Sequence, residues 1–240
     1  MKTITPILLT FLVLITTTTF SQNKKVKANG NIITTTRTVS DFDKIAVSGS
    51  FDVTLKKGKG KAVTIEASSN LMDIIETIVE NNQLKIKFKS GWNIRTSKKI
   101  NITVTYEALS AVTLSGSGSI ISEDEIIANN LALKVSGSGN MKLKLFTDNL
   151  TATISGSGNL KLTGETNIVT CSLSGSGNLN ASNLKAAITN AKVSGSGNVK
   201  IQASEEIYAK ASGSGNIIYS GEPNIIKANS SGSGSVRKIN

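Results

Sequence analysis

The sequence has no histidine, one cysteine and two prolines among its 240 residues, and aromatic residues make up 4% of it. With Cys171 as the single cysteine, no intrachain disulfide can form, so packing and backbone hydrogen bonds must stabilise the fold. Because no histidine can activate the Cys171 thiol, we interpret this residue as a buried small apolar side chain. Scarce aromatic rings also argue against stacking on bases, and we expect no nucleic-acid partner.

Long apolar runs are absent apart from one at the N-terminus. Lys2 precedes the apolar segment 6–15, which is too short to span a bilayer, and Thr19-Phe20-Ser21 has the small-x-small pattern of a cleavage site. We predict a Sec signal peptide over residues 1–21, with an uncleaved N-terminal anchor as the alternative. No cysteine follows the run, so a lipid-anchored form is not expected. We therefore expect a mature chain without a transmembrane segment that is periplasmic, on the outer surface or secreted.

Acidic residues are fewer than basic residues in this sequence. The chain has 27 Lys and Arg against 16 Asp and Glu, which gives a net charge of +11. A basic exported protein concentrates near anionic surfaces. The expected partners are therefore a cell-surface glycan, such as an acidic polysaccharide, or the anionic surface of the envelope.

The most prominent feature that is present is a repeated tetrapeptide. Ser-Gly-Ser-Gly begins at residues 115, 136, 155, 174, 194, 212 and 231, at intervals of 18 to 21 residues. A flexible linker would gather these residues in one run, and a phosphate-binding loop would need one copy leading into a helix. A fixed period near 20 residues is instead typical of a solenoid. Since the strict hexapeptide rhythm of left-handed β-helices is missing, we predict an all-β, right-handed parallel β-helix over residues 111–240.

Apolar and polar residues alternate through each copy of the motif. In the third copy Ile154, Leu160 and Leu162 share one face with both glycines, and the serines and asparagine occupy the other. A period of two indicates strand, with the glycines inward and the Ser and Asn side chains outward. We expect the glycines where the interior is too narrow for a side chain or where the chain turns a corner. Turn signals such as Ser220-Gly221-Glu222-Pro223 fall on the opposite side of the coil, where length differences should be absorbed.

Residues 37–110 have the same character without the regular period. The segment FDKIAVSGSFDVTL contains a degenerate motif in which Phe51 replaces the second glycine. Residues 70–82 could be a short helix with Asn70 as N-cap, or a strand and turn, which we favour. We interpret 37–110 as extra coils or a β-cap over the first regular coil, and 22–36 as a flexible N-terminal segment. Further strands are predicted at 62–68, 83–89 and 100–107.

The combination of FDKIAVSGSFDVTL with repeated SGSGN followed by Ile, Leu or Val resembles the head GIN-domain family, the "putative autotransporter adhesins". The resemblance covers nearly all of the mature chain, and Phe42, Ile45, Val47 and Gly49 together with Gly215-Asn216-Ile217 carry it. It implies a right-handed parallel β-helix in an exported protein of a Gram-negative bacterium. It implies no catalytic residues.

Carboxylate clusters are the candidates for catalysis, because parallel β-helices also host polysaccharide lyases and hydrolases. Glu123-Asp124-Glu125 and Glu205-Glu206 lie in predicted turns, and adjacent residues do not converge on one point. Calcium-binding repeats need Asp where this chain has Asn or Ser. We therefore predict no enzyme, no metal site and no cofactor, with a polysaccharide-processing enzyme as one alternative.

The outward ladder of hydroxyls and amides is the candidate ligand-binding face. Such a periodic surface could contact a glycan, although small polar residues also suit a tightly turned strand; ice binding is disfavoured because its faces use threonine. Outward lysines at 142, 144, 161, 200 and 210 add positive charge. The sequence thus predicts an exported, adhesin-like surface-interaction module, with a structural envelope protein as a further alternative. The ladder comprises Ser136, Ser138, Asn140, Ser155, Ser157, Asn159, Ser174, Ser176, Asn178, Ser194, Ser196, Asn198, Ser212, Ser214 and Asn216.

Overall fold

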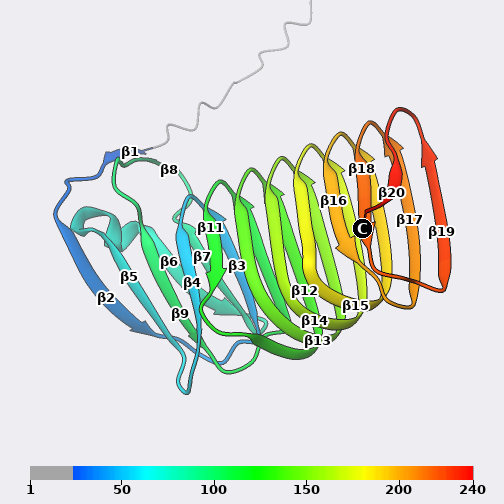
Figure 1. Cartoon of the computed structure of the whole chain (residues 1–240). Helices are drawn as coiled ribbons and strands as arrows, with labels where there is room; N and C mark the ends of the chain where they lie inside the picture. Colours follow the sequence, from blue (N-terminus) through cyan, green and yellow to red (C-terminus); the bar gives the residue numbers. More distant parts are fainter. Residues whose placement is uncertain (1–23, 240) are drawn as a thin grey trace, which may run out of the picture.

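The computed structural model describes residues 24–239, and the predicted signal peptide lies outside them. The chain forms an elongated stack of β-coils whose N-terminal end is covered by additional strands (Figure 1). This confirms the predicted all-β, right-handed parallel β-helix. The described residues include no helix that is long and apolar enough to cross a membrane.

Every regular coil pairs in parallel with the coils on either side of it. The register brings equivalent positions of successive repeats together, as in Ala152 with Cys171 and Cys171 with Ala191. The strands of this part are β10 (Ala111–Gly116), β11 (Ser119–Ser122), β12 (Ile126–Gly137), β13 (Asn140–Gly156), β14 (Asn159–Gly175), β15 (Asn178–Gly195), β16 (Asn198–Gln202), β17 (Glu206–Gly213), β18 (Asn216–Ser220), β19 (Ile225–Ser231) and β20 (Val236–Lys238).

A single coil shows how the sequence pattern builds the core. Along β13, Met141, Leu143 and Leu145 are buried on the way out from the motif, and Ala152 and Ile154 are buried on the way back. Lys142 and Lys144, which alternate with the first three, are exposed. One coil alone buries too little apolar surface to offset the entropy of ordering about 20 residues, so the coils are stable only as a stack.

The motif forms the sharp corner of each coil, and its two glycines have different roles. The second glycine is buried and faces inward as predicted; a Cβ on Gly177 would lie 2.2 Å from the Gly158 carbonyl oxygen. The prediction that the first glycine also faces inward is wrong. Gly156 is only half-buried and has φ of +116°, a conformation that side chains disfavour and that lets the chain bend at Ser157.

Coil length varies on the side away from the motif, as predicted. The register between β14 and β15 shifts between Lys161 and Thr163, which accommodates one additional residue as a bulge. The residues before the motif remain in register from coil to coil despite this shift. The Ser-Gly-Ser-Gly corners therefore stack in a straight column.

The N-terminal strands form a cap with mixed pairing. Strand β5 lies antiparallel between β2 and β9, and β6 forms an antiparallel hairpin with β7. A separate two-stranded sheet joins β1 and β8 in parallel. The elements of this part are β1 (Lys24–Lys27), β2 (Ile32–Thr38), β3 (Lys44–Gly49), β4 (Asp52–Lys57), β5 (Ala62–Ser68), the 3-10 helix η1 (Ser69–Ile74), β6 (Ile75–Glu80), β7 (Gln83–Phe88), β8 (Trp92–Arg95) and β9 (Asn101–Tyr106).

The order of coils in space differs from their order in the sequence. Strands β3 and β4 make the first motif-bearing coil, and β10 and β11 stack on one side of it. Strands β7 and β9, which come later in the chain than β3 and β4, stack on its other side. Phe51 fills the space of the missing second glycine and packs against Phe88, with ring centroids 4.5 Å apart.

Two predictions for the N-terminal part need correction. Much of the segment 22–36, predicted to be flexible, lies in β1 and β2 because both strands find pairing partners in the cap. Residues 70–82 are neither wholly helix nor wholly strand, since η1 continues into β6. Asn70 does not cap η1; its side-chain amide donates to the Lys27 carbonyl at 2.9 Å and so ties β1 to the cap.

Candidate functional site

The predicted Ser/Asn ladder lies on the outside of the sharp corner. Its serines and asparagines are exposed or half-buried in every coil. They do not form one flat face, because the chain bends at the second serine of the motif. Ser155 therefore lies next to the end of β13, Ser157 occupies the bend and Asn159 begins β14. The ladder is a ridge that runs along the stack.

The asparagines of this ridge hydrogen-bond to one another, and we call Asn140, Asn159, Asn178, Asn198 and Asn216 the asparagine ladder. Each side-chain amide donates to the carbonyl oxygen of the preceding one, as from Asn159 to Asn140 at 2.8 Å and from Asn178 to Asn159 at 3.0 Å. The series ends where the Ser235 hydroxyl donates to Asn216 at 2.8 Å. Part of the amide capacity is thus used within the protein. Inner members such as Asn159 and Asn178, which donate once and accept once in the series, keep one N–H and one lone pair for a ligand.

A small hollow of about 300 Å³ runs beside the asparagine ladder. The ladder forms one wall, and the exposed side chains of Lys142 and Lys161 stand on the other. Ile121, 44% exposed, continues the row of Lys142 and Lys161. This hollow therefore brings asparagines of the predicted Ser/Asn ladder together with two of the predicted outward lysines.

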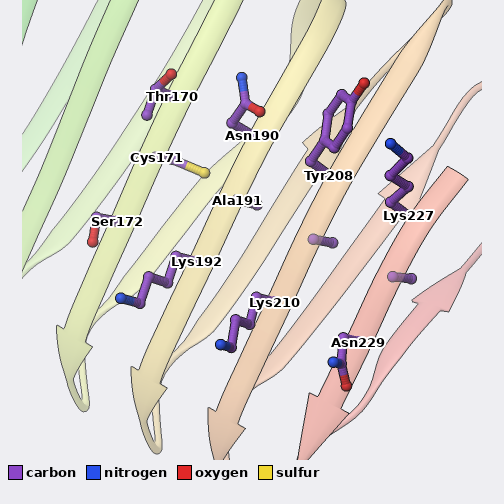
Figure 2. Close-up of a pocket in the computed structure, with 12 residues that line it drawn as sticks. Thr170, Cys171, Ser172, Asn190, Ala191, Lys192, Tyr208, Lys210, Lys227 and Asn229 are labelled. Carbon is purple, nitrogen blue, oxygen red and sulfur yellow. The ribbon is translucent and has the colours of Figure 1, made fainter. Parts of the chain in front are cut away.

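A larger hollow of about 580 Å³, which we call the axial groove, lies across β14, β15, β17 and β19 (Figure 2). It runs parallel to the stack between two rows of outward side chains. One row is Thr170, Asn190, Tyr208 and Lys227, and the other is Ser172, Lys192, Lys210 and Asn229. Between the rows, the floor is formed by the backbone of Cys171, Ala191, Ala209 and Ala228, and the side chains of the first three are buried in the interior.

The axial groove is positively charged. Lys192, Lys210 and Lys227 line it without any acidic residue, and none of the three forms an ion pair with another residue in the range 24–239. The Lys227 ammonium lies 5.3 Å from the centroid of the Tyr208 ring. Tyr208 donates its hydroxyl to Glu206 at 2.9 Å, and this hydrogen bond raises the pKa of the phenol. The phenol thus stays neutral beside the lysines.

Sequence reasoning named Lys210 as an outward lysine but did not find the axial groove. The signal was present in the repeat alignment, since two positions before the motif stand Ser172, Lys192, Lys210 and Asn229 in successive copies. Four positions before the motif, Tyr208 and Lys227 follow one another in the same way. The rows lie side by side only once the coils are paired in register.

The carboxylate candidates are placed apart by the structure. Asp124 accepts a hydrogen bond from the Lys57 backbone amide at 2.9 Å, whereas Glu125 is directed to Lys144, 3.6 Å away. Glu206 accepts a hydrogen bond from the Tyr208 hydroxyl. Among residues 24–239 no group of three or more His, Cys, Asp or Glu side chains is placed to hold a metal ion.

Cys171 is buried as predicted, with 1% of its surface exposed. Burial raises the pKa of its thiol from the usual 9.0 to about 12. The thiol is therefore protonated near neutral pH and does not act as a nucleophile.

Several solved structures share the architecture. A "putative adhesin" from Bacteroides fragilis NCTC 9343 has 27% identity and a TM-score of 0.84, over 89% of this chain and 100% of that one. A "putative lipid binding protein" from Parabacteroides distasonis ATCC 8503 also has 27% identity, with a TM-score of 0.75 over 90% and 100%. A "putative adhesin" from Parabacteroides merdae ATCC 43184, 23% identical with a TM-score of 0.74 over 90% and 100%, shares the fold. No curated protein matches the chain.

The sequence also matches a family profile described as "Putative auto-transporter adhesin, head GIN domain" over residues 41–223. This range contains the degenerate motif around Gly49, most of the cap and all but the last of the Ser-Gly-Ser-Gly corners. The chain belongs to the auto-transporter adhesin head GIN-domain family.

Proposed function

We propose that this protein is an exported, non-enzymatic adhesion module that binds an acidic glycan along the side of its β-helix. The observation that carries the proposal is the axial groove, in which three lysines without ion-pair partners among the described residues flank an uncharged floor. Membership of an adhesin family and the resemblance to an adhesin structure of 27% identity support the adhesive role. Export rests on the predicted signal peptide.

The chemistry of the axial groove suits a linear chain that bears carboxylates or other anionic groups. Lys192 and Lys210 occupy equivalent positions in adjacent coils, about 4.8 Å apart along the stack, so they can bind successive anionic groups. Asn190, Thr170 and Ser172 offer donors and acceptors to sugar hydroxyls. The ring of Tyr208 supplies one apolar surface for a sugar face.

Isothermal titration calorimetry with polygalacturonate, an acidic polysaccharide, tests the proposal. Neutral dextran is the comparison. The Lys192→Gln plus Lys210→Gln variant should bind polygalacturonate at least ten-fold more weakly, because hydrogen bonds to charged groups contribute about 1.5–3 kcal/mol each. The matched control, Lys142→Gln plus Lys161→Gln, removes the same charge beside the asparagine ladder. Equal binding of dextran and polygalacturonate by the wild-type protein would refute the acidic glycan.

The Ser/Asn ladder is the second candidate location for the same function, favoured by the hollow between the asparagine ladder and Lys142 and Lys161. If the glycan binds there, the control variant loses affinity and the groove variant keeps it. Replacement of Ser157 and Ser176 by Glu would then also abolish binding, because bulky anionic side chains would cover the ridge and repel the acidic glycan. Unchanged binding after this replacement excludes the ladder.

A further inference from the structure

The two-stranded sheet of β1 and β8 lies at the capped end of the stack (Figure 1). Its exposed side chains include a cluster of like charges. Lys27 pairs directly with Arg95, and Lys25 pairs with Asn93; all four side chains are exposed. The alternate residues Val26, Trp92 and Ile94 pack against the core. One face of this small sheet is therefore cationic while the other is held by the cap.

This arrangement costs stability in the isolated protein. Like charges directly opposite each other on neighbouring strands repel. Lys25, Lys27, Arg95 and the following Lys98 form no ion pair within residues 24–239. The nearby Lys99 is the exception, at 2.8 Å from Asp52. An external anion would relieve the repulsion that the protein itself leaves uncompensated.

The cluster also borders a hollow. A space of about 440 Å³ is lined by Lys27, Arg95, Ala28, Ile94, Thr96 and Ser97. Lys27 and Arg95 place two cations at this space, and Ser97 adds a hydroxyl group, whereas the Thr96 hydroxyl donates to the Lys98 carbonyl at 2.8 Å. On the other face of the sheet, the Lys24 ammonium lies 5.4 Å from the centroid of the Trp92 ring, so that an amphipathic ring stands beside the charges.

We propose that the cationic face of β1 and β8 binds the surface of an anionic lipid bilayer through its phosphate headgroups. A single dissolved phosphate would gain little at side chains as exposed as these, because water and salt screen isolated surface pairs. A lipid surface presents many anions at once and attracts every cation of the cluster together. The position of the face fits this role, since it lies at the cap, whereas the axial groove lies toward the C-terminal end of the stack (Figure 1).

Sedimentation of the full chain with lipid vesicles tests the inference. The protein should bind phosphatidylcholine vesicles that contain phosphatidylglycerol and should not bind vesicles of phosphatidylcholine alone. Each basic residue removed from a lipid-facing cluster lowers the partition coefficient about five-fold. The variant Lys25→Gln, Lys27→Gln and Arg95→Gln should therefore bind about 100-fold more weakly. Its melting temperature should not fall, because it removes like-charge repulsion.

The matched control is Lys142→Gln, Lys161→Gln and Lys200→Gln, which removes the same net charge from exposed positions on the regular coils. It should bind vesicles nearly as well as the wild type. An equal loss in both variants would show attraction by net charge alone and overturn the inference. Release of the protein by millimolar inorganic phosphate at constant ionic strength would also overturn it, by indicating a site for the free ion. Because these vesicles carry no glycan, the result is independent of the function proposed for the axial groove.

Discussion

Replacing Gly177 by Ala tests whether the corner glycines are required by the closeness of the coils. Gly177 is a buried second glycine, and its φ is not in the positive range. A Cβ there would lie 2.2 Å from the Gly158 carbonyl oxygen and 3.0 Å from Ile154 Cγ2. The first of these atoms belongs to the backbone of the preceding coil, which cannot rotate away. The two coils must therefore move apart at the corner.

The loss of stability can be worked out from the hydrogen bonds between coils that this movement would break. The Gly158 carbonyl accepts a hydrogen bond from the backbone N–H of Asn178 at 3.2 Å. The Gly156 carbonyl accepts one from the backbone N–H of Gly177 at 2.9 Å. Each such bond contributes about 1 kcal/mol, and overpacking of a filled interior costs about 1–3 kcal/mol. We expect Gly177→Ala to lower the free energy of unfolding by roughly 3 kcal/mol or more.

Guanidinium denaturation followed by circular dichroism measures this loss. Gly60→Ala is the control for backbone conformation alone, because Gly60 has φ of +89° but nothing within 4 Å of its Cβ position. The control should lose about 1 kcal/mol. If Gly177→Ala lost no more than Gly60→Ala, steric contact between coils would not be the reason for the glycine, and our account of the motif would be refuted.

The remaining predictions concern other parts of the fold. Gly234→Ala should lower the free energy of unfolding by less than Gly177→Ala in the same assay, because among residues 24–239 β19 pairs only with β17 and the last coil can shift; an equal loss would contradict this. Because the folded Cys171 thiol has a pKa of about 12 against 9.0 ordinarily, the unfolded chain binds fewer protons between these values, so stability should fall as the pH rises from 9 toward 12. We expect a loss of roughly 2–3 kcal/mol by about pH 11, and Cys171→Ala should remove this part of the pH dependence. Tyr106→Phe should leave the melting temperature unchanged or raise it, because the buried Tyr106 hydroxyl has no hydrogen-bond partner within residues 24–239; a clear decrease would indicate a hidden partner. Asn178→Asp should destabilise the stack by about 1 kcal/mol, because a carboxylate cannot donate to Asn159, whereas Ser176→Ala on the same ridge should be nearly neutral.

The regular part of the fold could be predicted from the sequence because one physical pattern repeats. Alternation placed Cys171 and the aliphatic residues inside, and the shared spacing set the register between coils. The role of Gly156 could not be resolved in this way. A residue at a bend and a residue facing inward can both occupy the same place in a period-two pattern, and only the backbone conformation separates them.

The cap and the axial groove were harder to predict for a different reason. Pairings such as β3 with β10 join residues that are far apart in the chain, and no local signal in β2 or β1 specifies its partner. The axial groove depends on four separate strands, so its walls are visible only after the coils are aligned. The predicted ladder was found because all of its residues belong to one short motif.

The detour between β4 and β10 has a consequence for how the molecule could vary in length. Ser119 lies directly above Asp52 although 67 residues separate them, so the coil of β3 and β4 is followed in space by the coil of β10 and β11 as though the cap strands did not intervene. The part of the cap from β5 to β9 is thus an insertion in an otherwise continuous β-helix. Whole turns could be gained or lost downstream of it, changing how far the C-terminal tip extends while the base stays the same.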